Sequence, residues 1–253
     1  MCNALENDVA KDGNDEVRLT QASMAYDRLR EDVISGVLAP SQRLTLDMLK
    51  ERYHVGVTPL REALYRLSAS LLVETEDQRG FRVADVSMQH FRQVIAARES
   101  FETLILIESI KTGDLDWEGR VLAAHNQLKK LPMYEGAENA LSPVWTKAHR
   151  QFHYQVLSGS RHFFLEHFQS ILWDHATRYR NILKPDPLSA EVLKRDHDQL
   201  LEAVMGRDGE FACMILRRHI KNGAAAVLRA LGEPRGSIGP TSETTNFNRP
   251  VAA

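Results

Sequence analysis

The chain of 253 residues is 43% hydrophobic and 26% charged, with a formal net charge of −2. These values suit one large or two ordinary globular domains, and they exclude a global positive field as the means of attracting nucleic acid or anionic membranes. The two cysteines exclude a disulfide framework and a cysteine-rich zinc site. A polar N-terminus and apolar runs too short to span a bilayer predict a cytoplasmic protein with no membrane partner.

The two ends of the chain differ in composition from its middle. Residues 1–20 are rich in Asp, Glu and Asn, and residues 233–253 are rich in Gly, Pro, Ser and Thr, so both segments are predicted to be disordered. Between them, residues 21–86 combine short helical patterns with a strand–turn–strand pattern, and residues 87–232 are helical throughout. The predicted fold is mainly α: a small α+β domain followed by an all-α bundle of six to seven helices.

In chain order, the first domain is predicted to contain three short helices and a hairpin. The helices cover 25–36, 46–53 and the stretch from Thr58 onward, and the hairpin turns at Gly80. A short turn between two helices and a two-stranded wing after them predict a winged helix-turn-helix, in which the start of the third helix enters the major groove of DNA. The helices of the second domain are predicted from Ser87 onward and over 116–131, 139–157, 161–183, 189–205 and 208–231.

The third helix of the first domain is the candidate DNA-reading element. Thr58 and Pro59 are its predicted N-cap and first helical residue. Its apolar stripe consists of Leu60, Leu64, Leu67 and Leu71, and its opposite face of Thr58, Arg61, Tyr65 and Arg66. Arg43 and Arg79 are expected at the preceding turn and the wing tip, which also face the duplex in this fold. Because the domain is not basic overall, the alternative that these arginines merely solvate a surface stays open.

Four of the ten histidines form a pattern. His149 and His153 are one helical turn apart, and His197 and His219 lie on two later predicted helices, each beside apolar residues at helical spacing. All four are therefore predicted to point into the bundle interior, where imidazoles from facing helices commonly bind divalent ions such as Zn or Ni. Surface histidines or a hydrogen-bonded polar pair in the core are the alternatives for such spacing.

Residues 36–83 resemble the DNA-binding domain of GntR-type transcriptional regulators. The matching segments are Gly36, Pro40, Arg43-Leu44, the run VTPLREAL from Val57, Arg79-Gly80 and Val83. The resemblance implies that Arg43, Thr58, Arg61 and Gly80 contact double-stranded operator DNA. The chain has Gly56-Val57 where the family usually has Ser-Arg. The operator sequence of the wider family therefore does not carry over.

Residues 87–231 resemble the ligand-binding domain called FCD, which follows the winged helix in one large GntR subfamily. The segments HRQFH, DHDQLL and RRHI match its metal-binding pattern, which implies a divalent metal held by His149, His153, His197 and His219. The family often has Asp at position 149, and an all-nitrogen set favours Zn or Ni over Mn or Mg. Arg98 and Glu102 match an Arg-x-x-x-Glu motif, which makes Arg98 the expected clamp for an effector carboxylate. An ordinary helix-surface salt bridge is the alternative for this pair.

The function implied by these resemblances is transcriptional regulation rather than catalysis. We expect a homodimeric repressor of a catabolic operon, released from a palindromic operator by a small carboxylate. Residues 51–64 and 78–89 resemble the carbon-starvation-induced repressors within the subfamily, which points to glutarate. One alternative is a regulator with a purely structural metal and no effector. A metal-dependent hydrolase is another, although HRQFH lacks the glutamate of the hydrolase motif His-Glu-x-x-His.

Overall fold

The computed structural model describes residues 20–76, 80–137, 140–183 and 190–232 of the chain. The predicted disordered tail, and the predicted disordered arm apart from Thr20, lie outside these residues. Two compact units are present: one comprises Ser41–Ala84 with the chain up to Asp32, and the other comprises Val33–Pro40 with the chain from Asp85 onward. The described residues are mainly helical, which confirms the predicted fold class.

The first unit is a winged helix-turn-helix. Its elements are α1 (Gln21–Ser35, which ends in the second unit), β1 (Arg43–Leu44), α2 (Leu46–Tyr53), α3 (Val57–Ala69), β2 (Val73–Glu76) and β3 (Gly80–Val83). The strands form an antiparallel sheet in the order β1-β3-β2, with Leu44 opposite Phe81 and Val73 opposite Val83. The short strand β1 was not predicted. Apolar side chains of the helices and the sheet form the core, among them Leu29, Leu49, Leu60, Leu64, Leu67 and Phe81.

Two details of α3 differ from the predictions. The helix begins at Val57 behind Gly56, which provides no side-chain cap, so Thr58 is not the N-cap. The Gly56 backbone is extended and its carbonyl accepts a hydrogen bond from the Leu60 N–H, and Pro59 is tolerated because the first turn has no intrahelical acceptors for its amides. Leu71 is 65% exposed because the helix has already ended, and Leu72 enters the core instead.

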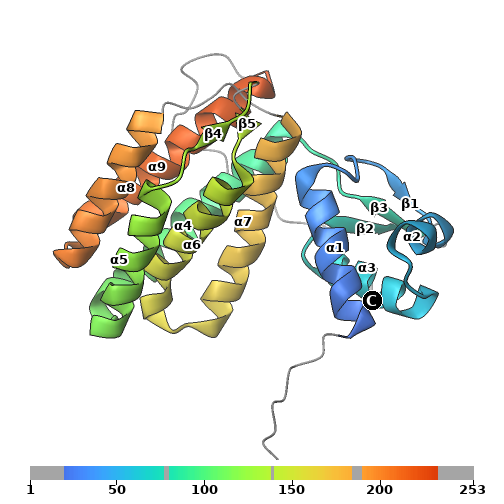
Figure 1. Cartoon of the computed structure of the whole chain (residues 1–253), viewed down its shortest axis with the longest axis horizontal. Helices are drawn as coiled ribbons and strands as arrows, with labels where there is room; N and C mark the ends of the chain where they lie inside the picture. The colour runs from blue at the N-terminus through green and yellow to red at the C-terminus, as the bar shows by residue number, and fades with distance from the viewer. Residues whose placement is uncertain (1–19, 77–79, 138–139, 184–189, 233–253) are drawn as a thin grey trace, which may run out of the picture. The chain divides into compact units, whose positions relative to one another are not determined.

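The second unit is a bundle of six α-helices among the described residues. They are α4 (Met88–Thr112), α5 (Leu115–Lys129), α6 (Pro143–Leu157), α7 (Phe163–Leu183), α8 (Ala190–Met205) and α9 (Gly209–Ala230), with a 3-10 turn η1 (Ser158–Ser160) after α6. The long helix α4 packs against α7 and α9, whereas α5 packs against α6 and α8 (Figure 1). The elements that carry the predicted histidines thereby converge at the centre of the unit.

The start of α6 differs from the predicted helix over 139–157. Ala140–Leu141 form a short strand, β5, which pairs with β4 (Tyr134–Glu135). The helix then begins at Pro143, because the Ser142 side chain caps the Trp145 N–H and proline suits the first helical position. Residue 139 itself lies outside the described residues. The other end of α6 is fixed to α4, since the Ser109 hydroxyl donates to the Leu157 carbonyl over 2.5 Å.

None of the helices in the described ranges has the length and apolar character needed to cross a bilayer.

Candidate functional site

A cluster of four buried histidines lies at the centre of the helical unit. His149 and His153 come from α6, His197 from α8 and His219 from α9. None of the four is more than 6% exposed. Their ligand-type atoms all lie within 4.8 Å of one another, so the folded chain brings together the four histidines that the sequence singled out.

The separations between the ring nitrogens show that the four imidazoles converge on one point. The Nε2 atom of His149 lies 3.1 Å from that of His197, 3.1 Å from that of His153 and 3.4 Å from that of His219. A single imidazole nitrogen has one in-plane direction for either a proton or a lone pair, so it cannot form three hydrogen bonds at once. A central cation that accepts all four lone pairs accounts for this arrangement.

The protonation state of the cluster also suits a metal. Burial lowers the pKa of all four histidines, that of His197 to about 3. Neighbouring imidazoles lower the pKa values of His149, His153 and His219 further. The rings are therefore neutral at physiological pH, and only neutral imidazole offers a lone pair to a metal. With Zn–N bonds of about 2.0–2.1 Å, tetrahedral ligands lie roughly 3.3 Å apart, which agrees with the three measured separations.

Carboxylate and amide groups surround the outer side of His219. The Nδ1 atom of His219 is buried without a hydrogen bond and lies 3.9 Å from Oδ2 of the buried Asp196. Asp196 is held by Arg218, whose Nη2 donates over 2.6 Å, and by Asn222, whose amide donates over 3.2 Å. A metal-bound histidine usually donates its second N–H to such a carboxylate, which fixes its tautomer. Arg218 and Asn222 were not among the residues predicted for the site.

Two tryptophans flank the cluster. The ring of Trp145 stacks on His149 with centroids 4.6 Å apart and an interplanar angle of 16°. Trp173 of α7 lies 5.4 Å from His149 and 5.2 Å from His153 between centroids. Both indoles are nearly fully buried. They exclude water from the imidazoles and hold the rings in position.

Arg98 and Glu102 form a buried ion pair beside the cluster. Arg98 Nε lies 2.6 Å from Glu102 Oε1, and the two side chains are 7% and 0% exposed, so the alternative of a helix-surface salt bridge is wrong. The Arg98 guanidinium lies 4.9 Å from the ring centroid of Trp173. The same Trp173 ring lies 5.2 Å from that of His153 between centroids, so Arg98 is close to the cluster. The charge of Arg98 contributes to lowering the pKa values of His153 and His219.

Arg180 of α7 is a second cation near the cluster that the sequence analysis missed. Burial, and then repulsion from Arg98, lower the pKa of Arg180 to about 10. Its charge lowers the pKa values of His149, His153 and His219. Among the described residues, Arg180 has no hydrogen bond or ion pair. Its closeness to the cluster could not be deduced from periodicity, because Arg178 on the same helix is also buried.

The predicted DNA-contacting residues occupy the exposed side of the first unit. Thr58, Arg61, Tyr65 and Arg66 are exposed on α3, and Arg43 and Gly80 are exposed on β1 and β3. Tyr65 packs edge-on against Phe81 of the wing, with centroids 5.2 Å apart. Arg66 is directed to α1, where its guanidinium lies 4.2 Å from the Tyr26 ring centroid. Arg79 lies outside the described residues.

Comparisons with known proteins agree with this division of the chain. Residues 21–83 match the model of the family described as bacterial regulatory proteins, gntR family, and residues 93–222 match that of the FCD domain. A winged helix-turn-helix joined to a helical unit with a buried histidine cluster defines a DNA-binding transcription regulator. The chain belongs to the GntR family, in the branch whose second domain is FCD. Members of this family are regulators and not enzymes, so the hydrolase alternative is set aside.

The chain is similar to other bacterial regulators over most of its length. It is 37% identical over 199 residues to the HTH-type transcriptional repressor GlaR of Escherichia coli (strain K12), covering 77% of this chain and 90% of that protein. The HTH-type transcriptional regulator BphR of Paraburkholderia xenovorans (strain LB400) is 34% identical over 208 residues, 82% and 84% of the two chains. The solved structure of E. coli McbR/YncC has the same fold, with a TM-score of 0.70, 18% identity and coverage of 83% and 98%.

Proposed function

We propose that the protein is a homodimeric repressor of a catabolic operon, released from a palindromic operator by a small dicarboxylate bound beside a divalent metal. The observation that carries this proposal is the buried Arg98, whose guanidinium lies 4.9 Å from the ring centroid of Trp173, the tryptophan that flanks the four-histidine cluster. Repression is supported by the name of the similar E. coli regulator GlaR. The DNA-binding residues are those exposed on α3 and on the neighbouring strands, together with Arg79.

The metal is Zn or Ni, held by His149, His153, His197 and His219. Four imidazole nitrogens favour these borderline ions over Mn and Mg, which prefer oxygen ligands. The bound ion would supply a positive charge for the effector and, where it expands beyond four ligands, an acceptor for a carboxylate oxygen. The chain itself keeps the rings neutral through burial and orients His219 with Asp196 close to its outer nitrogen.

The charge balance around the cluster favours a dianionic effector. Glu102 neutralises Arg98 in the free protein, whereas Arg180 has no ion pair among the described residues and the neutral imidazoles leave the metal charge uncompensated. A dicarboxylate can place one carboxylate at the metal and Arg98 and the other at Arg180. Arginine suits this role because its planar guanidinium donates two parallel hydrogen bonds to a carboxylate. Glutarate is our best candidate, in keeping with the resemblance to the carbon-starvation-induced repressor.

An exposed apolar strip supports the homodimer. Phe101, Leu104 and Ile107 on α4 and Phe164 and Phe168 on α7 are all at least 36% exposed, and the rings of Phe101 and Phe168 lie 6.2 Å apart. Contiguous exposed apolar side chains of this kind mark interaction surfaces. Leu104→Glu should yield a monomer in light scattering after size-exclusion chromatography, whereas Leu122→Glu on α5 should leave a dimer. A wild-type monomer at micromolar concentration would contradict the proposal.

Effector release acts through differential affinity for two states of the dimer. In one state the two winged helices match the operator half-sites, and in the other they do not. An effector that binds the second state more tightly lowers the affinity for DNA, at most by the ratio of its affinities for the two states. The alternative, a purely structural metal, predicts that chelation lowers the melting temperature while no dicarboxylate raises that of the metal-loaded protein. A thermal-shift series with Zn alone and with Zn plus glutarate separates the two functions.

The decisive experiment is a gel shift on the DNA upstream of the protein's own gene. We expect specific retardation of a palindrome, and release by glutarate within a panel that also contains succinate, adipate and acetate. Arg98→Lys should still bind the operator but should need far more glutarate for release, because lysine lacks the two-pronged donor. No specific retardation would overturn the regulatory proposal, and retardation insensitive to every carboxylate would leave the structural-metal alternative.

A further inference from the structure

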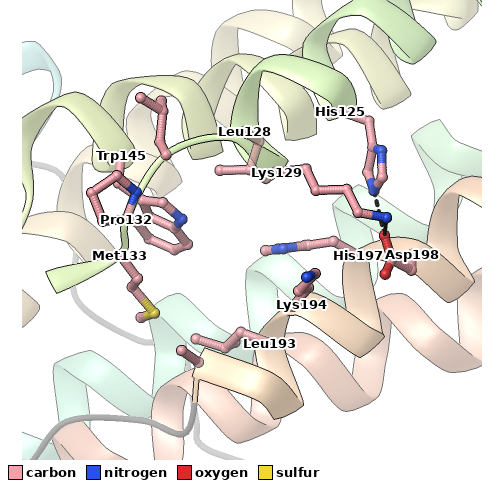
Figure 2. Close-up of a pocket in the computed structure, with 12 residues that line it drawn as sticks. His125, Leu128, Lys129, Pro132, Met133, Trp145, Leu193, Lys194, His197 and Asp198 are labelled. Carbon is pink, nitrogen blue, oxygen red and sulfur yellow. Dashed lines mark hydrogen bonds and ion pairs between the residues drawn. The ribbon is translucent and has the colours of Figure 1, made fainter.

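A cavity of ≈270 Å³ lies between the helices α5, α6 and α8 and is also lined by residues 131–133, which follow α5 (Figure 2). It shares two side chains with the surroundings of the metal site: His197 lines it, and so does Trp145, which stacks on His149. Arg98, Glu102 and Trp173 do not line it. The cavity therefore has a different lining from the proposed effector position, although it adjoins the histidine cluster through His197.

The two ends of the cavity differ in chemistry. Pro132, Met133 and Trp145 lie at one end, and His125, Lys129 and Asp198 at the other (Figure 2). Leu128, Leu131 and Leu193 add further apolar lining. A volume near the lower end of the ~300–1,000 Å³ typical of small-molecule sites suits a compact ligand with one polar and one apolar end.

The charged side chains that line the cavity leave one cation, Lys194, without a partner among the described residues. Asp198 Oδ1 lies 2.9 Å from His125 Nε2 and 3.3 Å from Lys129 Nζ, so Lys129 neutralises its charge. Burial lowers the pKa of His125 in spite of the neighbouring carboxylate, which keeps this imidazole neutral at physiological pH. Lys194 has no hydrogen bond or ion pair among the residues that the structure describes. Its ammonium is thus available to an anion in the cavity.

We propose that this cavity is a second ligand site, for a small monocarboxylate with an apolar body. The carboxylate binds Lys194, and the aliphatic or aromatic part lies against Met133, Leu193 and Trp145. One negative charge matches one unpaired cation, whereas a dianion is unfavourable next to Asp198. Occupancy is coupled to the metal site, because His197 and Trp145 contact both.

Isothermal titration calorimetry of the full-length protein with hexanoate tests the proposal. Hexanol, which has the same apolar body without charge, and sulfate, which has charge without an apolar body, are the matched probes. Hexanoate should bind with one site per chain, and both other compounds should bind at least roughly tenfold more weakly, as expected for losing one charge-assisted hydrogen bond or the apolar burial. Hexanol binding as tightly as hexanoate would overturn the proposal.

Variants locate the site and separate it from the proposed effector position. Lys194→Gln should weaken hexanoate binding about five- to tenfold, in the range for loss of a partly exposed charge–charge contact. Lys147→Gln, an exposed position on α6 outside the cavity, should bind hexanoate like the unaltered protein. If Arg98→Lys weakens hexanoate binding and Lys194→Gln does not, hexanoate occupies the effector position and the cavity proposal is wrong.

The same titration keeps this inference independent of the proposed function. Hexanoate binding that depends on Lys194 and persists in EDTA and in His153→Ala supports the cavity even if glutarate fails to release DNA. Coupling between the cavity and the metal site is measured from two affinities. Hexanoate must change the affinity for zinc by the same factor by which zinc changes the affinity for hexanoate. Equal zinc affinities with and without saturating hexanoate would overturn the coupling.

Discussion

Arg98 and Glu102 are paired within the interior of the helical unit, with Nε and Oε1 2.6 Å apart and Nη2 and Oε2 3.4 Å apart. A buried ion pair contributes little net stability, because desolvation offsets the attraction, but removing one partner leaves a buried charge uncompensated. The position of this ion pair beside the histidine cluster therefore agrees with the proposed role in ligand binding.

Removing one partner of this pair should be far more costly than replacing both. Arg98→Ala should destabilise the protein by about 3–5 kcal/mol because Glu102 remains charged and buried. The double variant Arg98→Met with Glu102→Leu should recover most of that loss. Urea denaturation followed by circular dichroism measures both values. Equal losses in the single and double variants would show that the pair stabilises the fold in its own right.

Metal removal should lower the stability of the protein through the histidine cluster. At a zinc concentration 1,000-fold above the dissociation constant, binding adds about 4 kcal/mol to the free energy of unfolding. EDTA should remove this contribution and lower the melting temperature in differential scanning calorimetry. In His153→Ala, EDTA should have little further effect. A chelator shift of equal size in that variant would place the metal elsewhere.

The histidine at position 149 should determine which metal is preferred. His149→Asp exchanges a nitrogen ligand for an oxygen ligand and should bring the affinity for Mn closer to those for Zn and Ni. Competition against a chromogenic chelator gives the three dissociation constants for each protein. An unchanged ranking would contradict an inner-sphere role for His149.

Stability of the metal-free protein should fall with acidification below pH 6.5. The folded-state pKa values of the four histidines are lowered, to about 3 for His197, whereas in the unfolded chain a histidine titrates near its ordinary value. Between pH 6.5 and 3 the unfolded chain therefore binds more protons. Each buried neutral histidine then costs about 1.4 kcal/mol of stability per pH unit. No loss of this kind arises above pH 6.5, where both states are neutral.

Urea titrations of the EDTA-treated protein from pH 7.5 to 5 measure this slope. His197→Gln should reduce it by about one proton equivalent. A slope that does not change in this variant would mean that His197 becomes protonated in the folded state.

Arg66 should contribute to stability in addition to the DNA contact proposed for it, whereas Arg61 should contribute to DNA binding alone. Arg61→Ala should weaken operator binding and, if it contacts a phosphate, reduce the slope of log K against log salt by about 1. Arg66→Ala should lower stability by about 0.5–1 kcal/mol, because its guanidinium stacks on Tyr26. Fluorescence anisotropy at several salt concentrations and thermal melts distinguish the two. Unaltered DNA binding in Arg61→Ala would remove it from the interface.

The sequence predicted that the four histidines point into the bundle, because helical periodicity shows which residues share a buried face. It did not reveal Trp145, Trp173 or Arg180 as neighbours of the cluster, because contacts across helices depend on packing that single-helix periodicity does not encode. Asp196 belongs to the matched segment DHDQLL, but its place beside His219 was not predicted, for the same reason. The strand β5 was misread as helix because two residues give no period.

The sequence also did not show which apolar residues of α4 are exposed. Phe101 and Leu104 follow the apolar spacing of α4, yet they are 36% and 58% exposed. Periodicity records that a face is apolar, and it does not distinguish a face covered within one chain from a face that a second chain covers. Thr58 was misplaced as a cap because glycine at 56 leaves no side-chain signal, and the helix start is then set by backbone geometry.

The tryptophans beside the histidine cluster give the protein an internal optical reporter. Of its three indoles, two lie against the imidazoles, and the third, Trp117, lies elsewhere in the bundle with Arg207 over its ring. Emission from the first two should respond to whatever changes the electronic state of those rings, including protonation or a quenching paramagnetic ion. With Trp117→Phe removing the constant background, occupancy of the centre can be followed in real time in the unlabelled protein, even while it is bound to DNA.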